Sequence, residues 1–368
     1  ISTITPRFRN QDNERLIRIL SLQNSDLTWE KVYETNFGTD IGFLSNAISL
    51  SVDLYQKNSK DLLDIVRTSG MGGELNKYAN DASMTTRGVE LVLDTRNFKT
   101  EDFTWSTSVN FAYFNQEITS LANASNSVFN LVRETGGNVL GNPRNTLYSY
   151  DFAGLNSQGM PLLNLKNGST DYKDIDFQDR DNILSYLKKE GAVDPNITGG
   201  LSNTFRYKNW ELNFLITMQA GNKIRKAPLY KGAGYDDLSV FPREFKNRWV
   251  APGDEALTQI PGIVSQRTLN EENKAYISRA YSAYNHSTAR VVDGSFVRMK
   301  SISLSYTFDK EVLENLNLGN LTLRLQASNP FLIYAHKDLN GQDPEFFRSG
   351  GVAYPITPQY TFTINLGI

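Results

Sequence analysis

The side chains that most often perform catalysis or bind metal ions are scarce in this chain of 368 residues. It contains no cysteine and two histidines, His286 and His336, which lie far apart in the sequence. Without cysteine the chain can form no disulfide scaffold, iron–sulfur cluster or reactive thiol. Two distant histidines leave little material for a zinc site or for a triad with a histidine base. We therefore interpret both as solvated polar positions and predict no enzymatic activity, no catalytic residue and no cofactor.

An acidic run is the one candidate for a cation site. It carries five aspartates at short spacing: Asp171, Asp174, Asp176, Asp179 and Asp181. Carboxylate oxygens are the ligands that Ca²⁺ prefers, but a calcium loop also needs a glycine for its sharp turn, and the run DYKDIDFQDRD has none. A solvated charge run is the more common explanation. We predict no metal site here, with Ca²⁺ binding as the alternative.

Aromatic side chains are the third kind of candidate. The long polar segment 221–294 is rich in them and includes Tyr230, Tyr235, Phe241, Trp249, Tyr276, Tyr281 and Tyr284. A ring on an outer loop can stack on a sugar or pack beneath a partner protein, and rings that anchor the loop itself are equally common. We take Trp249, Tyr281, Tyr284 and Tyr235 as candidates for contact with a ligand or partner.

The composition excludes several classes of protein. The 38 basic and 40 acidic side chains give a net charge of −2, so the chain lacks the basic excess of a nucleic-acid-binding protein. No stretch approaches the ~20 consecutive apolar residues of a membrane-spanning helix. A membrane β-barrel stays possible, because alternating strands keep the mean hydropathy low.

The elements that must position these residues are indicated by alternation of apolar and polar residues along most of the chain. One example is the segment 301–308, where Ile302, Leu304 and Tyr306 alternate with serines. The pattern predicts antiparallel strands with one apolar and one polar face. We place eleven of them, at residues 28–42, 47–58, 84–97, 102–117, 145–154, 159–166, 198–207, 210–220, 295–309, 319–333 and 359–368.

The connections between these strands alternate regularly between short and long, and the longest, 221–294, has 74 residues. A sandwich has no reason to place every long loop at one end, whereas an outer-membrane barrel has tight periplasmic turns and long extracellular loops. The sequence therefore predicts an all-β, transmembrane antiparallel barrel. Its lumen should receive the polar side chains Ser301, Ser303, Thr322, Arg324, Thr361 and Asn365. A periplasmic belt should contain the turn-side aromatic residues Trp105, Tyr207, Trp210 and Tyr306.

A series of motifs resembles the C-terminal barrel half of SusC/RagA-type TonB-dependent outer-membrane transporters. In order along the chain, these are NSDLTWEK (24–31), TTRGVELVL (85–93), NRWVAPGD (247–254), DGSFVRMKSISLSYTF (293–308), SNPF (328–331), GQDPE (341–345) and the closing YPITPQYTFTINLGI. Two features depart from the family: the acidic run lacks the glycine of a calcium loop, and the last residue is Ile368 where barrel proteins commonly end on an aromatic.

The resemblance implies location in the outer membrane and TonB-dependent active import of glycans or peptides. It also implies two protein partners: a SusD-like surface lipoprotein over the barrel mouth, and TonB, which acts through an N-terminal plug. In this family the acid pair Asp343 and Glu345 belongs to a structural loop element before the last strand. We expect the lipoprotein to contact the long loops 221–294 and 334–358. The alternative function is that of a soluble, secreted β-sandwich that binds carbohydrate.

Barrels of this class have about 22 strands around a plugged lumen, and eleven are predicted here. We therefore expect residues 1–368 to be the C-terminal part of the barrel domain, with the plug and the first barrel half absent. Because eleven is odd, strands 28–42 and 359–368 run the same way and should not pair with each other.

Overall fold

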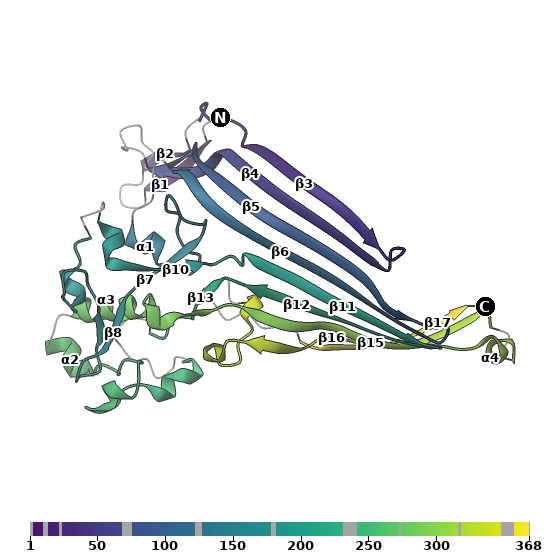
Figure 1. Ribbon diagram of the computed structural model, residues 1–368. Helices are drawn as coiled ribbons and strands as arrows, with labels where there is room; N and C mark the ends of the chain where they lie inside the picture. Colours follow the sequence, from purple (N-terminus) through teal and green to yellow (C-terminus); the bar gives the residue numbers. More distant parts are fainter. Residues whose placement is uncertain are drawn as a thin grey trace.

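The computed structural model describes ten stretches of the chain: residues 3–9, 14–21, 24–67, 76–121, 127–177, 182–230, 241–271, 274–315, 318–346 and 357–367. Six of them contribute strands to one large antiparallel sheet of nine strands (Figure 1). From one edge to the other these are β3 (Lys31–Phe43), β4 (Ile48–Arg67), β5 (Asn76–Lys99), β6 (Phe103–Leu121), β11 (Ile197–Tyr207), β12 (Trp210–Ala220), β15 (Phe296–Thr307), β16 (Asn320–Ala335) and β17 (Gln359–Gly367). Each strand pairs with the strand of this series that precedes it in the chain, as in an up-and-down barrel wall.

The predicted difference in loop length is confirmed for most connections. Tight turns join β3 to β4, β5 to β6 and β11 to β12, and a longer connection that contains α4 (Lys310–Asn315) joins β15 to β16; all lie at one end of the sheet (Figure 1). The connection between β4 and β5 is shorter than predicted, because these strands extend to Arg67 and from Asn76. The longest insertions leave the opposite end, between β6 and β11 and between β12 and β15. By analogy with other outer-membrane barrels, the short-turn end is the periplasmic end.

The two faces of the sheet differ as the alternation predicts. Leu304 pairs with Leu325, which pairs with Phe362, so these apolar side chains share one face. They are not packed in a core: Leu325 and Phe362 are each 58% exposed. Ser303, Arg324 and the other predicted lumen residues alternate with them on the opposite face. This arrangement confirms the predicted orientation, and it argues against the soluble sandwich, which would bury the apolar face beneath a second sheet.

One glycine shows how the wall is fitted together. Gly88, in the TTRGVELVL motif, pairs directly with Tyr55 on β4. A β-carbon added at Gly88 would lie 2.4 Å from Cζ of Tyr55, so the tyrosine ring lies across the glycine. An aromatic ring in this position covers the backbone that glycine exposes and fixes the register of the two strands.

Two of the eleven predicted strands were assigned wrongly. Residues 145–154 and 159–166 form β7 (Thr146–Tyr150), β8 (Phe152–Leu155) and β9 (Pro161–Leu163), which lie outside the nine-stranded sheet. All five residues of β7 are buried. A barrel-wall strand would instead have one face toward lipid and one toward the lumen. Alternation of apolar and polar residues therefore does not distinguish an internal strand such as β7 from a wall strand.

The remaining elements are short and lie mostly in the connections. The strands are β1 (Thr3–Arg9), β2 (Glu14–Ser21), β10 (Leu187–Ala192), β13 (Lys223–Arg225) and β14 (Val291–Asp293). They form the two-stranded sheets β1–β2, β7–β10, β8–β9 and β13–β14. The α-helices are α1 (Val128–Leu131), α2 (Gln266–Glu271), α3 (Lys274–Asn285) and α4 (Lys310–Asn315). The 3₁₀ turns are η1 (Tyr172–Asp174), η2 (Ile183–Tyr186), η3 (Arg243–Asn247), η4 (Asp254–Ala256), η5 (Thr288–Arg290), η6 (Lys337–Leu339) and η7 (Pro344–Phe346). Within the described stretches, every helix is too short or too polar to cross a bilayer.

The sheet remains open, with β3 and β17 at its two edges. Each of them pairs with one neighbour, and in the described part of the chain they do not pair with each other. This confirms the predicted relation between the first and last strands, since nine strands, like eleven, place them in the same direction.

Candidate functional site: a polar lumen below a packed loop body

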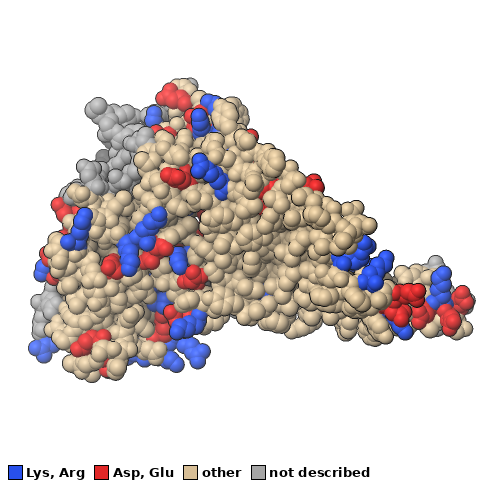
Figure 2. Space-filling model, in the orientation of Figure 1, with Lys and Arg blue, Asp and Glu red and all other residues tan. Residues whose placement is uncertain are grey.

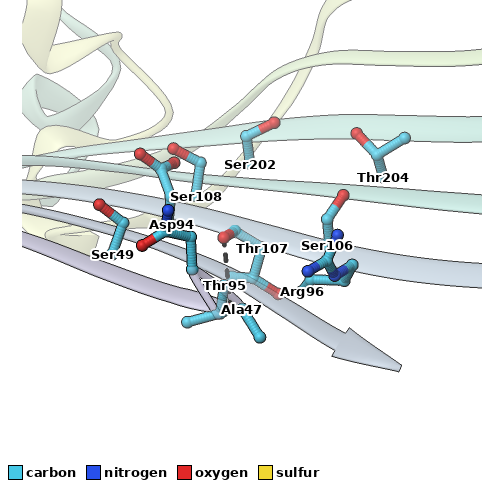
Figure 3. A pocket seen from close by; sticks show the side chains of 11 residues that line it. Ala47, Ser49, Asp94, Thr95, Arg96, Ser106, Thr107, Ser108, Ser202 and Thr204 are labelled. Atoms are coloured by element: carbon cyan, nitrogen blue, oxygen red, sulfur yellow. Dashed lines mark hydrogen bonds between the residues drawn. The ribbon is translucent and has the colours of Figure 1, made fainter. Parts of the chain in front are cut away.

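The polar face of the sheet contains a hollow of about 260 Å³ near the short-turn end. Figure 3 shows side chains that line it, which come from β4 and the turn before it and from β5, β6 and β11. Five of them are small hydroxyl residues that alternate with lipid-facing positions: Ser49, Ser106, Ser108, Ser202 and Thr204. Asp94 and Arg96 bring opposite charges to the same hollow. Such a lining can hydrogen-bond water, a polar solute or another polypeptide.

The connections at the long-loop end pack into a unit of their own, here called the loop body, which comprises the described residues within 127–196 and 221–295. One core contains Tyr148, Tyr150 and Leu163 from the first segment together with Ala283 from the second. Another is formed by the second segment and includes Phe152 of the first at its margin. The backbone joins them as well, because Tyr150 N donates to the carbonyl of His286 at 3.1 Å. Most of the buried apolar residues therefore lie in the loop body and not in the barrel wall.

Buried arginines hold the loop body together. Arg225 is 4% exposed and donates to the carbonyls of Tyr148 and Ser287, so it links both segments. Burial lowers the pKa of Arg225 to about 10. Arg290 is 1% exposed and donates to Glu244 Oε1 at 2.6 Å.

Glu244 also accepts a hydrogen bond, at 2.8 Å, from Lys226. Burial alone would raise the pKa of the Glu244 carboxyl, but the positive charges of Arg290 and Lys226 outweigh this effect, and the pKa is lowered. The carboxylate is thus held in its charged form between two cations.

A second ion cluster joins the loop before the last strand to the lumen side of the wall. Arg298 of β15 is 4% exposed and pairs with Asp343, whose side chain is 7% exposed. Arg298 Nε also lies 3.2 Å from Glu345 Oε2. Asp343 and Glu345 of the GQDPE motif therefore both contact Arg298 of the DGSFVRMKSISLSYTF motif. The expectation of a structural role for this acid pair agrees with the geometry.

The aromatic candidates have different positions. Tyr281 and Tyr284 are each 1% exposed, and burial raises the pKa of both, that of Tyr284 to about 12. Tyr281 donates its hydroxyl to the carbonyl of Gly262 at 2.6 Å. The two rings are core residues of the loop body, so the expectation that they contact a ligand directly is corrected. Tyr235 lies outside the described residues.

Trp249 is half-buried, and its ring lies close to the backbone of two glycines. β-Carbons added at Gly159 and Gly262 would lie 2.4 and 2.6 Å from its ring atoms, so it packs against both glycines. Its indole Nε1 donates to Glu255 Oε2 at 3.0 Å, and Asp254 accepts from the backbone N–H of Val250 at 2.9 Å. These bonds make the NRWVAPGD motif a compact turn that leaves Val250 66% exposed.

The remaining candidates have local partners. His286 is half-buried; burial lowers its pKa, and its Nδ1 lies 2.8 Å from the carbonyl of Ser282. His336 accepts from the backbone N–H of Asp338 at 3.3 Å. In the acidic run, Asp171 binds Lys173 and Tyr276, while Asp179 and Asp181 fall outside the described residues. No group of three or more potential metal-ligating acids and histidines occurs in the described part of the chain.

At the short-turn end the apolar face carries the predicted aromatic belt. Tyr207 pairs with Trp210, which pairs with Tyr306, and the last two rings are 4.8 Å apart. Trp105 pairs with Phe205, one same-face position further from the turn. Tyr207, Trp210 and Tyr306 therefore share one row, as predicted, while Trp105 lies one row nearer the middle of the sheet. Figure 2 shows charged side chains gathered over the loop body and at the short-turn end, with a largely uncharged band between them on the face in view.

An open antiparallel wall with one apolar face, one polar face and an aromatic belt is the architecture of an outer-membrane β-barrel. The chain belongs to the family described as "TonB dependent receptor-like, beta-barrel", whose model matches residues 6–217. It is accordingly part of an outer-membrane protein.

Relatives and solved structures agree. The TonB-dependent receptor P39 of Formosa agariphila is 26% identical, and the match covers 91% of this chain and 34% of that protein. The TonB-dependent receptor SusC of Bacteroides thetaiotaomicron is 25% identical over 94% of this chain and 32% of its own. The "Structure of the RagAB peptide transporter" contains a chain that shares the fold, with a TM-score of 0.77, 24% identity, and coverage of 100% of this chain and 38% of that one. The chain thus spans about a third of the length of the curated relatives, and the SusC/RagA resemblance is confirmed.

Proposed function

We propose that this chain forms the C-terminal part of the barrel of a TonB-dependent importer that carries oligosaccharides or peptides across the outer membrane. The observation that supports this most directly is the nine-stranded wall itself, with an apolar outer face, a hydroxyl-rich lumen face and a loop body at one end. A wall of this kind separates lipid from a wet passage. Its role in transport is to enclose and line the route, while the energy comes from elsewhere.

The open edges support the proposal that another part of the barrel completes the ring. Backbone N–H and C=O groups left unpaired in the bilayer cost several kcal/mol each. The free edges of β3 and β17 would therefore pair with strands of a first barrel half. A plug inside the completed barrel would contact the hollow beside Asp94 and Arg96, and TonB would act through that plug.

We further propose that a SusD-like lipoprotein contacts the long loops 221–294 and 334–358, and that oligosaccharide or peptide passes between the lipoprotein and the barrel. The turn around Trp249 is our candidate for contact with partner or ligand, since it is rigid and exposes Val250 and Leu257, the latter at 85%. Tyr235 is retained as a second candidate. Neither Tyr281 nor Tyr284 is retained, since their rings are enclosed.

The test uses the complete transporter in its own bacterium. Cells with and without the gene are given fluorescent oligosaccharide and peptide pools, and uptake is measured with TonB active or depleted. Uptake that needs both the gene and TonB would support the proposal, and the pool that is taken up would identify the substrate class. Gene-dependent uptake that persists without TonB, or no gene-dependent uptake of either pool, would refute it.

The partner is tested separately by purification in mild detergent. A surface lipoprotein should co-purify with the wild-type protein and should be reduced when Val250 and Leu257 are both replaced by Asp. The matched control is the same replacement at Leu140, another loop-body side chain, which is 57% exposed. Absence of any co-purifying lipoprotein would refute the proposed partnership without bearing on transport.

A further inference from the structure

A cation lies on the lipid-facing side of the wall, at the point where the apolar surface ends. Along β5 the outward positions Leu93, Leu91 and Val89 are apolar, and the next outward position toward the loop body is Arg87, which is exposed. Arg87 pairs across the sheet with Gln56 of β4. The guanidinium therefore belongs to the first polar row beyond the apolar surface, on the outside of the barrel and not in its lumen.

The height of this cation follows from the geometry of the strand. Phe98, which is 53% exposed, lies on the same face of β5 among the aromatic residues of the short-turn end. Phe98 and Arg87 are eleven positions apart, with one bulge between them. Ten or eleven steps of about 3.3 Å, at a strand tilt near 40°, amount to about 25–28 Å along the membrane normal. The apolar band of an outer-membrane barrel is about 25 Å tall, so Arg87 lies at its far boundary, level with the headgroups of the outer leaflet.

The guanidinium is held in place but not neutralised. Its Nε donates to Gln56 Oε1 at 2.8 Å, and Gln56 Nε2 donates to Asn58 Oδ1 at 3.4 Å. Asn58 Oδ1 also accepts from the Thr85 hydroxyl at 3.0 Å. In the described part of the chain, no carboxylate lies within ion-pair distance of Arg87 and its Nη groups have no acceptor. The acid on the neighbouring strand, Glu117, lies opposite Thr85, one row farther from the apolar surface.

A second cation lies farther out on the same face. Lys60 of β4 is exposed and pairs directly with Lys31 of β3. Lys31 Nζ lies 2.6 Å from Asp61 Oδ2, whereas Lys60 Nζ lies 5.6 Å from the centre of the Tyr33 ring. Like charges directly opposite each other destabilise a sheet, and Asp61 compensates only one of the two. This surface therefore complements a ligand that carries more than one negative charge.

We propose that Arg87 and Lys60 bind phosphate groups of lipid A, the phosphorylated glycolipid of the outer leaflet. The Nη groups of an arginine present parallel N–H donors that match a phosphate, and the guanidinium keeps its charge at any physiological pH. Gln56 is the positioning residue, because it holds Nε and leaves the Nη groups for the ligand. The proposal rests on the outer-membrane location of the family and is independent of the proposed transport function.

The test uses the complete transporter, purified in mild detergent and stripped of bound lipid. Native mass spectrometry measures the dissociation constant of the tightest-bound copy of diphosphorylated lipid A. Arg87→Gln removes the charge and keeps a polar side chain. Lys57→Gln is the matched control, because Lys57 is a cation of the next position on β4 that faces the lumen beside Glu34. Loss of one cation at a membrane surface predicts about fivefold weaker binding for Arg87→Gln and no change for Lys57→Gln.

Two further measurements identify the part of the lipid that is bound. Dephosphorylated lipid A should bind equally to the wild type and to Arg87→Gln, because the contact is with phosphate. Inorganic phosphate in large excess should not displace lipid A from the wild type, since the acyl chains hold the lipid against the apolar face. Displacement would show that free phosphate is the ligand and would overturn the assignment to lipid.

A second variant keeps the test decisive if Arg87→Gln fails to insert. Gln56→Leu leaves the arginine in place but removes the acceptor that positions it, so affinity for lipid A should fall by a smaller factor. Correct insertion of each variant is verified by heat-modifiable migration on gels. Unchanged affinity in either inserted variant, an equal fall in Lys57→Gln, or an equal loss with dephosphorylated lipid A would overturn the proposal.

Discussion

The ion cluster of Arg298 leads to the most specific prediction, which concerns the loop before the last strand. Replacing Arg298 by Met leaves the Asp343 carboxylate, with 7% of its side chain exposed, without its partner. Removing one member of a buried ion pair costs about 3–5 kcal/mol. Glu345 loses less, because its side chain is 33% exposed and Lys300 stays 3.9 Å away.

The lost free energy weakens the docking of residues 336–346 against the wall. A change of 3–5 kcal/mol alters the equilibrium between docked and open loop by about two to three and a half powers of ten. Hydrogen exchange in the complete protein measures this directly, because the N–H of Glu345 binds Asp343 Oδ1 at 3.1 Å and the N–H of Phe346 binds the Asp343 carbonyl at 3.2 Å. Both amides should exchange far faster in Arg298→Met, while amides of β16 should keep their protection.

A double variant separates charge from packing. Arg298→Met with Asp343→Asn removes both charges, so the uncompensated carboxylate no longer exists, and most of the protection should return. The reasoning would be refuted if Arg298→Met left exchange of this loop within about twofold of the wild type. It would also fail if the double variant exchanged as fast as the single one.

Three further predictions concern the wall and the loop body. Ile302→Arg places a charge on the lipid face and should destabilise the barrel by up to about 2–4 kcal/mol in urea unfolding, whereas Ser303→Arg, on the lumen face, should have much less effect; equal losses would contradict the face assignment. Glu244→Gln leaves Arg290 buried without its carboxylate and should accelerate hydrogen exchange around η5 by a hundredfold or more, in line with a cost of about 3 kcal/mol; unchanged exchange there would show that the pair is not needed. The lowered pKa of His286 means that the unfolded loop body binds more protons than the folded one, so its stability should fall as the pH drops below about 6.5. Proteolysis of the loops across this pH range should show that trend, and His286→Gln should weaken it.

The wall could be read from the sequence because its information is local. Alternation places neighbouring side chains on opposite faces of any strand, so the assignment of Leu304 to lipid and Arg324 to the lumen needs no knowledge of strand partners. The loop lengths then fix which ends of the strands lie together. The same local rules place strands 28–42 and 359–368 in one direction and hence apart.

The tertiary structure alone decided what the long connections do. Residues 145–154 alternate as convincingly as a wall strand, yet β7 is buried on both faces because the two loop segments close around it. The sequence does not distinguish the burial of Tyr281 from that of Trp249, but in the structure Tyr281 is enclosed in a core and Trp249 is half-buried. Likewise, Arg298 and Asp343 are 45 residues apart in the sequence and pair only in the folded chain. Alternation specifies the face of a side chain but not its neighbour across the sheet, and burial and pairing depend on those long-range neighbours.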